Sequence, residues 1–422
     1  MPATTLHKPS PALPDLGAFS PTPAEGEPST ERAVAGNAVA VARRIGAELR
    51  RTAGQRERDR ESPAAAVRQL RESGIVNLLI PRKFGGGGAS FKEAAEVVLE
   101  LSKADASIGA LLAFHFDVSA IPRLFDFKGG AEANDRASAA GNWFWGNSLQ
   151  GGFVKTFVAT PLPGGRLLLN GKKEWSTGVS LGDVLIVMAY RPDVDEVVFV
   201  RITPDRKGLV FHDDWDHLGL RLSEIITIDY NNVEVEAHEV IPSTHGKRIV
   251  GFPPFYNSIS SVFLNGATQL GAALGAVEQA REYTSTRTRP RGGLASANQD
   301  PYILAGYGEF WIKLQAALAL LEKVADEAQE AYDRRLTLTP REIGEIGVKA
   351  AALRVFTAQV GLEVTSRIYD VTGAHATANS HGFDRYWRDI RILSARHPLS
   401  YAIKMAGEYA LNDVVGEGGS FI

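Results

Sequence analysis

Residues 165–178 read GRLLLNGKKEWSTG, and this stretch determines how the middle of the chain can fold. Its apolar run meets Asn170-Gly171, a pair that tolerates positive φ and is typical of a tight turn between two strands. Three short apolar runs bounded by turn residues follow it: DVLIVMAY at 183–190, EVVFVRI at 196–202 and IITIDY at 225–230. We therefore predict a central β domain of barrel or sandwich type over residues 141–245, with a hairpin turn at Asn170-Gly171.

The sequence on the N-terminal side of this domain has helical patterning. Ser90 and Glu93 have the spacing of a capping box ahead of an apolar stripe, and Asp105 can cap the helix that follows. We predict an N-terminal helical domain over residues 30–140. Residues 1–29 contain seven prolines and no apolar core of a secretory signal, so we predict a disordered tail.

Helical signals return in residues 246–422. Asp300-Pro301 and the run Thr339-Pro340-Arg341-Glu342 are typical helix starts, and the second has capping-box spacing. The Ala- and Leu-rich stretch at 310–332 suits a long helix in a four-helix bundle. The predicted fold class is α+β with several domains, in the order helical, β, helical.

The composition excludes some classes of site and disfavours some classes of binding partner. The chain has 422 residues, 44% of them apolar, and a formal net charge of -3, which does not favour binding to nucleic acid or to an anionic membrane. There is no cysteine, so disulfides, thiolate metal sites and cysteine nucleophiles are excluded, and a reducing cytoplasm is the expected location. The nine histidines lack metal-ligand spacing, and no apolar run reaches the roughly 20 residues of a membrane span. We predict no metal.

The glycine run Gly85-Gly86-Gly87-Gly88 resembles a nucleotide-binding loop only superficially. Pro81 interrupts the join from the preceding apolar run, and Ser90 stands where a dinucleotide fingerprint needs its third glycine. A plain loop is the better interpretation. Because P-loop, HExxH and GxSxG motifs are absent as well, the sequence does not favour a hydrolase or a metalloenzyme.

Four motifs in order resemble the acyl-CoA dehydrogenase superfamily across nearly the whole chain from Thr30. They are SGIVNLLIPRKFGG at 73–86, the stretch at 165–178 with its Trp-x-Thr element, DYNNVEVEAHEVI at 229–241 and FDRYWRDIRI at 383–392. The resemblance implies a flavin site in which Trp175 and Thr177 meet the flavin ring, with Thr177 bonding the ring nitrogen N5. Considered alone, Thr177 could be an ordinary strand residue.

The resemblance also implies where the flavin phosphate binds. Arg287, with Arg289 beside it, falls at the family's phosphate-binding arginine, and Gly373-Ala374 falls at its glycine-rich turn. A simple helix-ending turn remains an almost equal alternative for Gly373-Ala374. Dehydrogenases continue after the arginine with Phe-Gly, which binds the adenosine half of FAD across a subunit interface. Here Pro290-Arg291 replaces that pair, which favours FMN over FAD.

The position of the family's catalytic base carries a histidine. Many of these dehydrogenases place a glutamate six residues after the K/R of the RDxK/RI segment, and that position in RDIRILSARHP is His397. Thioester oxidation needs a strong base beside the flavin, yet no Asp or Glu lies between Asp389 and Glu408. Some dehydrogenases carry the base on another helix, so an FAD-dependent acyl-CoA dehydrogenase with a relocated base remains an alternative. A non-catalytic flavin-fold protein is a third.

A histidine at that position is typical of the group D two-component flavin monooxygenases. The chain resembles these enzymes, particularly the dibenzothiophene monooxygenase and sulfur-acquisition branch. The marks are His115 in AFHF, Asn147 ending FWGN, DDWD at 213–216 and RYWRDIR before His397. The resemblance implies that a separate NAD(P)H:flavin reductase supplies reduced FMN. The reduced FMN reacts with O2 to form a C4a-hydroperoxide that transfers one oxygen atom. It further implies a homotetramer.

These relatives suggest roles for four side chains. His397 would hydrogen-bond and protonate the peroxide with a pKa near neutrality. We expect it to cap a helix beginning at Pro398, whose positive end disfavours imidazolium. Asn147 and Thr177 would offer neutral hydrogen bonds to the flavin. His115 is given a catalytic role by the branch, although a lone histidine on an apolar helix is usually a core residue.

The expected substrate pocket is apolar. Its predicted lining residues are Phe114, Phe116, Trp145, Phe263 and Leu393. Such a lining suits an apolar or aromatic small molecule, with oxidation of a thiophene-like or sulfone sulfur as the first expectation. Hydroxylation of an indole or phenol and N-oxygenation of an amine stay open. The family's HDP is RHP here, which places Arg396 at the substrate mouth.

Overall fold

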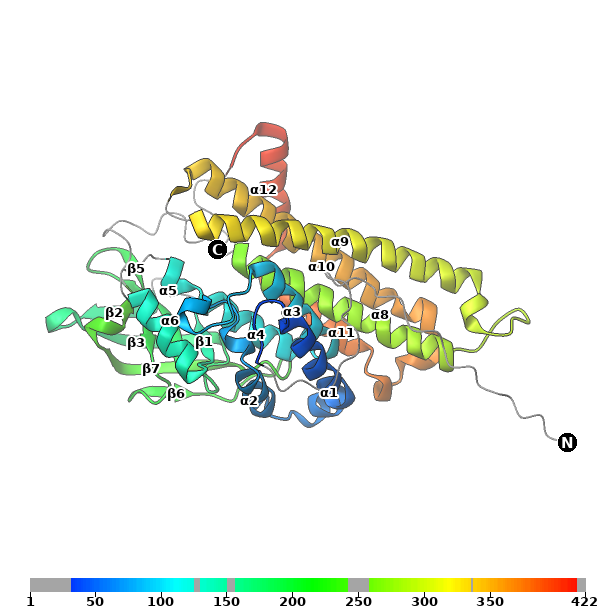
Figure 1. The fold of residues 1–422 in the computed structure, drawn as a ribbon, viewed down its shortest axis with the longest axis horizontal. Helices are drawn as coiled ribbons and strands as arrows, with labels where there is room; N and C mark the ends of the chain where they lie inside the picture. The colour runs from blue at the N-terminus through cyan, green and yellow to red at the C-terminus, as the bar shows by residue number, and fades with distance from the viewer. Residues whose placement is uncertain (1–31, 125–129, 150–155, 242–257, 335–336, 416–422) are drawn as a thin grey trace.

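The computed structural model describes residues 32–124, 130–149, 156–241, 258–334 and 337–415, and Figure 1 shows their arrangement. The predicted tail at 1–29 lies outside these residues. Helices form one side of the molecule, and a β-sheet lies at the end nearer to α5 and α6. The fold class is α+β in the predicted order.

The N-terminal helices are α1 (Ala38–Asp59), α2 (Ala64–Glu72), α3 (Phe91–Ala104), α4 (Ala106–Ser119), α5 (Ile121–Leu124) and α6 (Gly130–Gly141), with 3₁₀ turns at Ile75–Asn77 and Arg82–Phe84. Two of these helices, α3 and α4, begin at the capping residues that the sequence predicts. Ser90 Oγ accepts a hydrogen bond from the Glu93 amide at 3.2 Å, and Asp105 Oδ1 accepts one from Ser107 N at 3.0 Å. Both starts are confirmed, because each side chain satisfies an amide that the first turn leaves without an intrahelical partner.

In the described part of the chain, eight strands form one sheet. They are β1 (Trp145–Ser148), β2 (Val158–Pro161), β3 (Leu167–Thr177), β4 (Val184–Arg191), β5 (Glu196–Ile202), β6 (Leu209–Phe211), β7 (Ile225–Val235) and β8 (Val240–Ile241). Their order is β6-β7-β3-β1-β4-β5-β8, and β2 also pairs with both β3 and β4. The strands share an apolar core of their own, separate from that of the helices.

The predicted hairpin at Asn170-Gly171 is wrong. The pair lies inside β3, where the register against β7 shifts between Leu169 and Gly171. Gly171 has φ 130°, and Asn170 Oδ1 accepts a hydrogen bond from the Asn232 amide at 2.9 Å. The positive φ that favours a turn is found in a β-bulge here. The chain does not reverse at this point, because β3 pairs with β2 before the bulge and with β7 on both sides of it.

Further helices follow the sheet. They are the π-helix Ser261–Thr268, which continues as α8 (Gln269–Thr286), then α9 (Pro301–Arg334), α10 (Pro340–Thr372), α11 (Asp384–Ala395) and α12 (Leu399–Asn412). Short 3₁₀ turns lie at Pro163–Gly165, Ala237–Glu239, Ala297–Gln299, Ala374–Thr377 and Asn379–His381. The predicted starts of α9 and α10 are confirmed: Asp300 Oδ1 accepts from Tyr302 N at 2.9 Å, and Thr339 and Glu342 form a reciprocal capping box.

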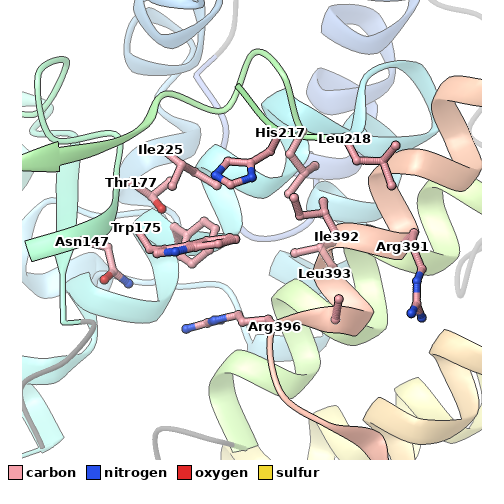
Figure 2. Close-up of a pocket in the computed structure, with 13 residues that line it drawn as sticks. Asn147, Trp175, Thr177, His217, Leu218, Ile225, Arg391, Ile392, Leu393 and Arg396 are labelled. Carbon is pink, nitrogen blue, oxygen red and sulfur yellow. The ribbon is translucent and has the colours of Figure 1, made fainter. Parts of the chain in front are cut away.

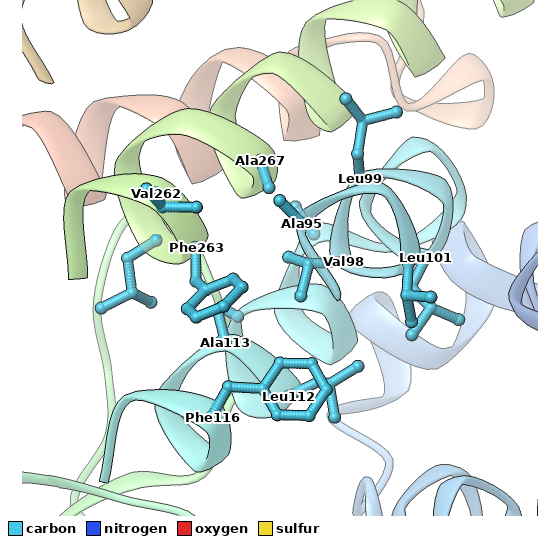
Figure 3. Packing of buried hydrophobic residues seen from close by; sticks show 14 of the residues in the cluster. Ala95, Val98, Leu99, Leu101, Leu112, Ala113, Phe116, Val262, Phe263 and Ala267 are labelled. Carbon is cyan, nitrogen blue, oxygen red and sulfur yellow. The ribbon is translucent and has the colours of Figure 1, made fainter. Parts of the chain in front are cut away.

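One apolar core joins the helices before the sheet to those after it. Figure 3 shows α3 and α4 packed against the π-helix and α8. Phe263 lies at its centre, with ring centroids 5.4 Å from Phe116 and 5.7 Å from Phe91. The two helical regions therefore form a common scaffold on which the sheet rests. Within the described ranges, no helix has the length and apolarity needed to cross a bilayer.

Candidate active site

A cavity of about 450 Å³ lies where the ends of β1 and β3 approach α11 (Figure 2). Four parts of the chain form its walls: α4 through Phe114, β1 and β3, the segment at 217–225, and α11 with the residue that follows it. The lining residues are Phe114, Asn147, Trp175, Thr177, His217, Leu218, Leu220, Ile225, Arg391, Ile392, Leu393, Ala395 and Arg396. Of the predicted substrate residues, Phe114 and Leu393 are in this set.

Asn147 and Thr177 occupy one cavity wall because β1 pairs with β3 at this point, with the two residues directly opposite each other. Asn147 is buried, and its Oδ1 accepts a hydrogen bond from the Leu149 amide at 3.1 Å. Its Nδ2 has no acceptor among the described residues. A buried N–H without a partner costs about 1–3 kcal/mol. A ligand that offers an acceptor at this wall, as a flavin ring edge does, would recover that cost, so the site fits the predicted cofactor.

Trp175 projects into the cavity from a second bulge in β3. The register against β7 shifts between Lys173 and Ser176, and Trp175 has φ 58°, a left-handed conformation that is costly for a bulky residue. Its indole is perpendicular to that of Trp215 at 5.1 Å, and His217 lies 5.0 Å away. This aromatic group offers a flat apolar surface to a planar ligand.

The segment that carries His217 and Leu218 is fixed to α11. Asp389 Oδ1 accepts a hydrogen bond from Leu220 N at 2.6 Å, and Arg388 Nη1 donates to the Leu218 carbonyl at 2.9 Å. Burial, together with the charge of Glu57, raises the pKa of Asp389 to about 7. Gly219 lies between these bonds, and a Cβ there would stand only 2.3 Å from the Arg388 carbonyl oxygen.

Replacing Gly219 with alanine is expected to distort this wall. The added methyl group would meet the backbone of α11, which cannot move as a side chain does, so we expect a loss of stability of about 1–3 kcal/mol and weaker ligand binding. Thermal unfolding and ligand titration measure the two effects. Gly308→Ala is the matched control, since a Cβ at Gly308 in α9 meets nothing within 4 Å. Equal stability and equal ligand affinity of the two variants would contradict the close contact between Gly219 and the backbone of α11.

His115 lies behind the cavity wall and does not line it. Its Nε2 bonds the Val76 carbonyl at 2.7 Å, and its Nδ1 accepts from the Trp145 amide at 2.9 Å. Burial lowers the pKa of His115 to about 4. Both ring nitrogens are committed to backbone groups, so the contacts favour a positioning role that holds β1 against α4 over the direct catalytic role that we expected.

Burial of neutral His115 predicts a pH-dependent stability. Below pH 6.5 the unfolded chain binds a proton at this histidine that the folded chain does not bind until about pH 4. Stability should therefore fall as the pH drops through this window, by about 1.4 kcal/mol per unit from this residue. Chemical unfolding at pH 7 and pH 5 measures the slope, and His115→Gln should flatten it. An unchanged slope in the variant would contradict the assignment.

His397 follows the cavity-lining Arg396 and is half-buried, but it does not itself line the cavity. Burial, with the charges of Arg396 and Arg354, lowers the pKa of His397 to about 3. The expectations of a near-neutral pKa and of a helix cap are therefore both corrected. Helix α12 begins at Leu399 with Pro398 as its N-cap, so His397 lies outside the helix and two arginines replace the helix end as its positive neighbours.

Three predicted substrate residues lie in the core instead of the cavity. Phe116 and Phe263 pack on each other, and Trp145 is buried with its Nε1 donating to Ser138 Oγ at 2.9 Å. On α4, residues 114 and 116 point to opposite sides, because two helical positions differ by about 200°. The sequence signal was aromatic content, which does not distinguish a pocket from a core.

Several lining residues were not expected from the sequence. His217, Leu218, Leu220 and Ile225 come from the segment just after DDWD, which we noted only as a family mark. Nothing in their types or spacing indicates a pocket; the fixation of that segment to α11 places them there. None of the described lining residues is an Asp or Glu. The sequence also has no acidic residue between Glu239 and Glu278.

The predicted phosphate-binding residues lie together, away from the cavity. Arg287 ends α8, Gly373 ends α10, and Thr288 Oγ1 donates to the Thr372 carbonyl at 3.1 Å, which joins the two helix ends. Arg287 and Arg289 are exposed, as is Ala374. Figure 1 shows the end of α8 on the side of the molecule opposite β1 and β3.

Comparison with known proteins agrees with this architecture. Residues 37–128 match the acyl-CoA dehydrogenase N-terminal domain, and residues 263–399 match the acyl-CoA dehydrogenase C-terminal domain. The dibenzothiophene monooxygenase of Mycolicibacterium goodii is 35% identical over 399 residues, which cover 89% of this chain and 94% of that protein.

Two solved structures are similar over almost their full length. TdsC of Paenibacillus sp. A11-2, in complex with FMN and indole, has a TM-score of 0.86 and 32% identity and covers 92% of this chain and 100% of its own. Methanesulfinate monooxygenase MsuC of Pseudomonas fluorescens has a TM-score of 0.85 and 32% identity, with 91% and 99% covered. The chain therefore belongs to the acyl-CoA dehydrogenase family, in the branch of flavin-dependent monooxygenases that includes dibenzothiophene monooxygenase.

Proposed function

We propose that the protein uses reduced FMN and O2 to add one oxygen atom to a small molecule with an apolar skeleton, a sulfur compound or an aromatic heterocycle. The observation that carries this proposal is the polarity of the cavity wall. It offers a buried amide donor from Asn147 and a hydroxyl from Thr177, and it has no carboxylate among its described lining residues. Removal of a proton next to a thioester would need such a base.

Bound reduced FMN would supply the two electrons and two hydrogens needed to reduce O2, so that one atom of O2 goes to the substrate and the other leaves as water. Asn147 and Thr177 would hold the ring at the β1–β3 wall, with the indole of Trp175 beside it. Phe114 and Leu393 would exclude water and pack against the substrate.

His397 would act from the end of α11. With a pKa of about 3 its imidazole is neutral at physiological pH. A neutral ring donates a hydrogen bond from one nitrogen and does not add a further positive charge beside Arg396 and Arg354. We propose that this N–H holds a proton at the oxygen that leaves as water. The relatives support the substrate class: the molecules in their names, dibenzothiophene, methanesulfinate and indole, are apolar or contain sulfur.

The flavin phosphate would bind to a second copy of the chain. Arg287 and Arg289 follow α8, and Gly373 and Ala374 follow α10. Figure 1 shows the end of α8 on the side of the molecule opposite β1 and β3, so we propose that these residues do not share one FMN with the cavity of their own chain. Large apolar side chains are exposed on α9, namely Tyr302 at 85%, Ile312 at 63% and Trp311 at 51%. Such a surface is suited to burial between subunits. We therefore propose a homotetramer with the phosphate site across an interface.

Two further proposals concern the source of reduced FMN and the location of the protein in the cell. The sequence has no dinucleotide fingerprint, so we expect an NAD(P)H:flavin reductase to deliver reduced FMN as a separate protein. The absence of cysteine fits the cytoplasm, where that reductase would act.

The proposal is tested by mixing the protein anaerobically with reduced FMN, adding ¹⁸O₂ and a panel of sulfur compounds and heterocycles, and measuring product masses. One labelled oxygen atom per product molecule is expected. An acyl-CoA panel with oxidised FAD is run in parallel. Formation of enoyl-CoA there, without oxygenated products in the first panel, would replace the proposal with a dehydrogenase.

A further inference from the structure

Arg396 is a positive charge in the cavity without a visible counter-ion. Its guanidinium lies 5.4 Å from the Phe114 ring centre, and among the described residues no carboxylate forms an ion pair with it. Figure 2 shows its side chain extending from the end of α11 toward the side where Asn147 lies, whereas the Arg391 side chain points away. Arg388, on the same helix, is paired with Glu57 at 2.6 Å and Asp384 at 2.8 Å.

A second arginine strengthens the positive charge at this end of the cavity. Arg354 on α10 is buried, and its Nη2 donates to the Pro398 carbonyl at 3.3 Å, just past His397. The charge of Arg396 adds to burial in lowering the pKa of Arg354 to about 10. The same two guanidinium groups depress the pKa of His397. Each guanidinium charge thus raises the free-energy cost of keeping the other one charged in this place, and a bound anion would lower that cost.

Guanidinium chemistry limits the kind of anion. The planar group presents parallel N–H donors that match the two oxygens of a carboxylate, sulfinate or sulfonate. The guanidinium of Arg396 lies over the Phe114 ring, a cation–π contact that helps to hold it in the cavity. Leu393 and Phe114 beside it are apolar, so the remainder of the ligand would be a small hydrocarbon group.

We propose that Arg396 forms an anion subsite, and that the substrate is an organic oxyanion whose charged group is bound by Arg396. This inference rests on the proposed oxygenase function. For a sulfinate the reaction balances as R–SO2⁻ + O2 + FMNH2 → R–SO3⁻ + FMN + H2O. A new S–O bond forms and the O–O bond breaks. Reduced FMN provides the two electrons and two hydrogens of the water.

The first experiment measures binding without turnover. Benzoate and benzamide have the same shape but differ in charge, and calorimetric titration of the full-length protein gives both affinities. We expect benzoate to bind at least about tenfold more tightly, the equivalent of one favourable charge contact. Arg396→Gln should remove that preference while leaving benzamide affinity unchanged. Arg68→Gln, which removes an exposed positive charge on α2, is the matched control and should retain the preference.

The second experiment separates the subsite from the flavin phosphate, which offers the same chemistry. Affinities of wild type and Arg396→Gln for FMN and riboflavin are compared. Unchanged affinity for both flavins, together with loss of benzoate binding, supports the substrate subsite. A loss confined to FMN would reassign Arg396 to the phosphate and overturn the proposal, as would equal binding of benzoate and benzamide by the wild type.

Turnover distinguishes failure of the subsite from failure of the oxygenase function. Benzenesulfinate and the neutral methyl phenyl sulfoxide are supplied with reduced FMN and O2. Arg396→Gln should raise KM for the sulfinate at least tenfold more than it raises KM for the sulfoxide. Oxygenation of both compounds with no change in the variant would refute the subsite alone. If the wild type oxygenates neither compound nor any other, the oxygenase function fails, while the titrations still decide the subsite.

Discussion

His397→Ala is expected to lower the rate of product formation by at least about 100-fold, the lower range for loss of a group that handles a proton in the reaction. The reason is local: His397 is neutral and half-buried beside Arg396 and Arg354, and no acidic residue lies between Asp389 and Glu408 to take its place. Product formed per reduced FMN consumed measures the effect, because flavin oxidation should continue and release hydrogen peroxide.

His238→Ala is the matched control, since His238 is exposed on the 3₁₀ turn at Ala237–Glu239. Its product yield should equal that of the wild type, and circular dichroism should show an unchanged fold for both variants. The depressed pKa gives the pH dependence: His397 stays neutral until the pH nears 3, so product formation should not decline with an apparent pKa near 6.5. Unchanged turnover in His397→Ala would remove this residue from the mechanism.

Asn147→Asp is expected to lower product formation by about 10²–10³, the effect of removing one preorganised donor from a reacting site. The substitution is nearly isosteric. It keeps an oxygen that accepts from the Leu149 amide, so the turn after β1 should survive. It replaces the unpartnered Nδ2 with an acceptor and adds a negative charge at the wall.

Flavin affinity and turnover are measured separately for this variant. Thr177→Ser is the matched control on the paired strand, because it keeps the hydroxyl and should retain most of the activity. Full activity in Asn147→Asp would show that the reaction does not need a hydrogen bond from the Asn147 amide, and would contradict the proposed role.

The sequence predicted the parts of the fold that local chemistry determines. Helix starts at Ser90, Asp105, Asp300 and Thr339 were located correctly, because a capping side chain bonds amides within its own first turn. The motif order predicted the family. Asn170-Gly171 was misassigned because positive φ suits both a turn and a bulge, and only the pairing with β2 and β7 distinguishes them.

The candidate site was less predictable. Asn147, Thr177, Trp175 and Leu393 line the cavity as expected, since the motifs mark strands and a helix that meet there. The pKa of His397 depends on burial, on Arg396 and on Arg354, which lies 43 positions earlier on α10, so the local sequence alone could not give it.

The most direct test of the account is a crystal structure of the protein with FMN bound. We expect the isoalloxazine ring in the cavity between β1, β3 and α11, with the Asn147 amide and the Thr177 hydroxyl bonded to it and the imidazole of His397 facing it. A ring in another place, or a carboxylate over the ring with His397 turned away, would contradict the oxygenase mechanism.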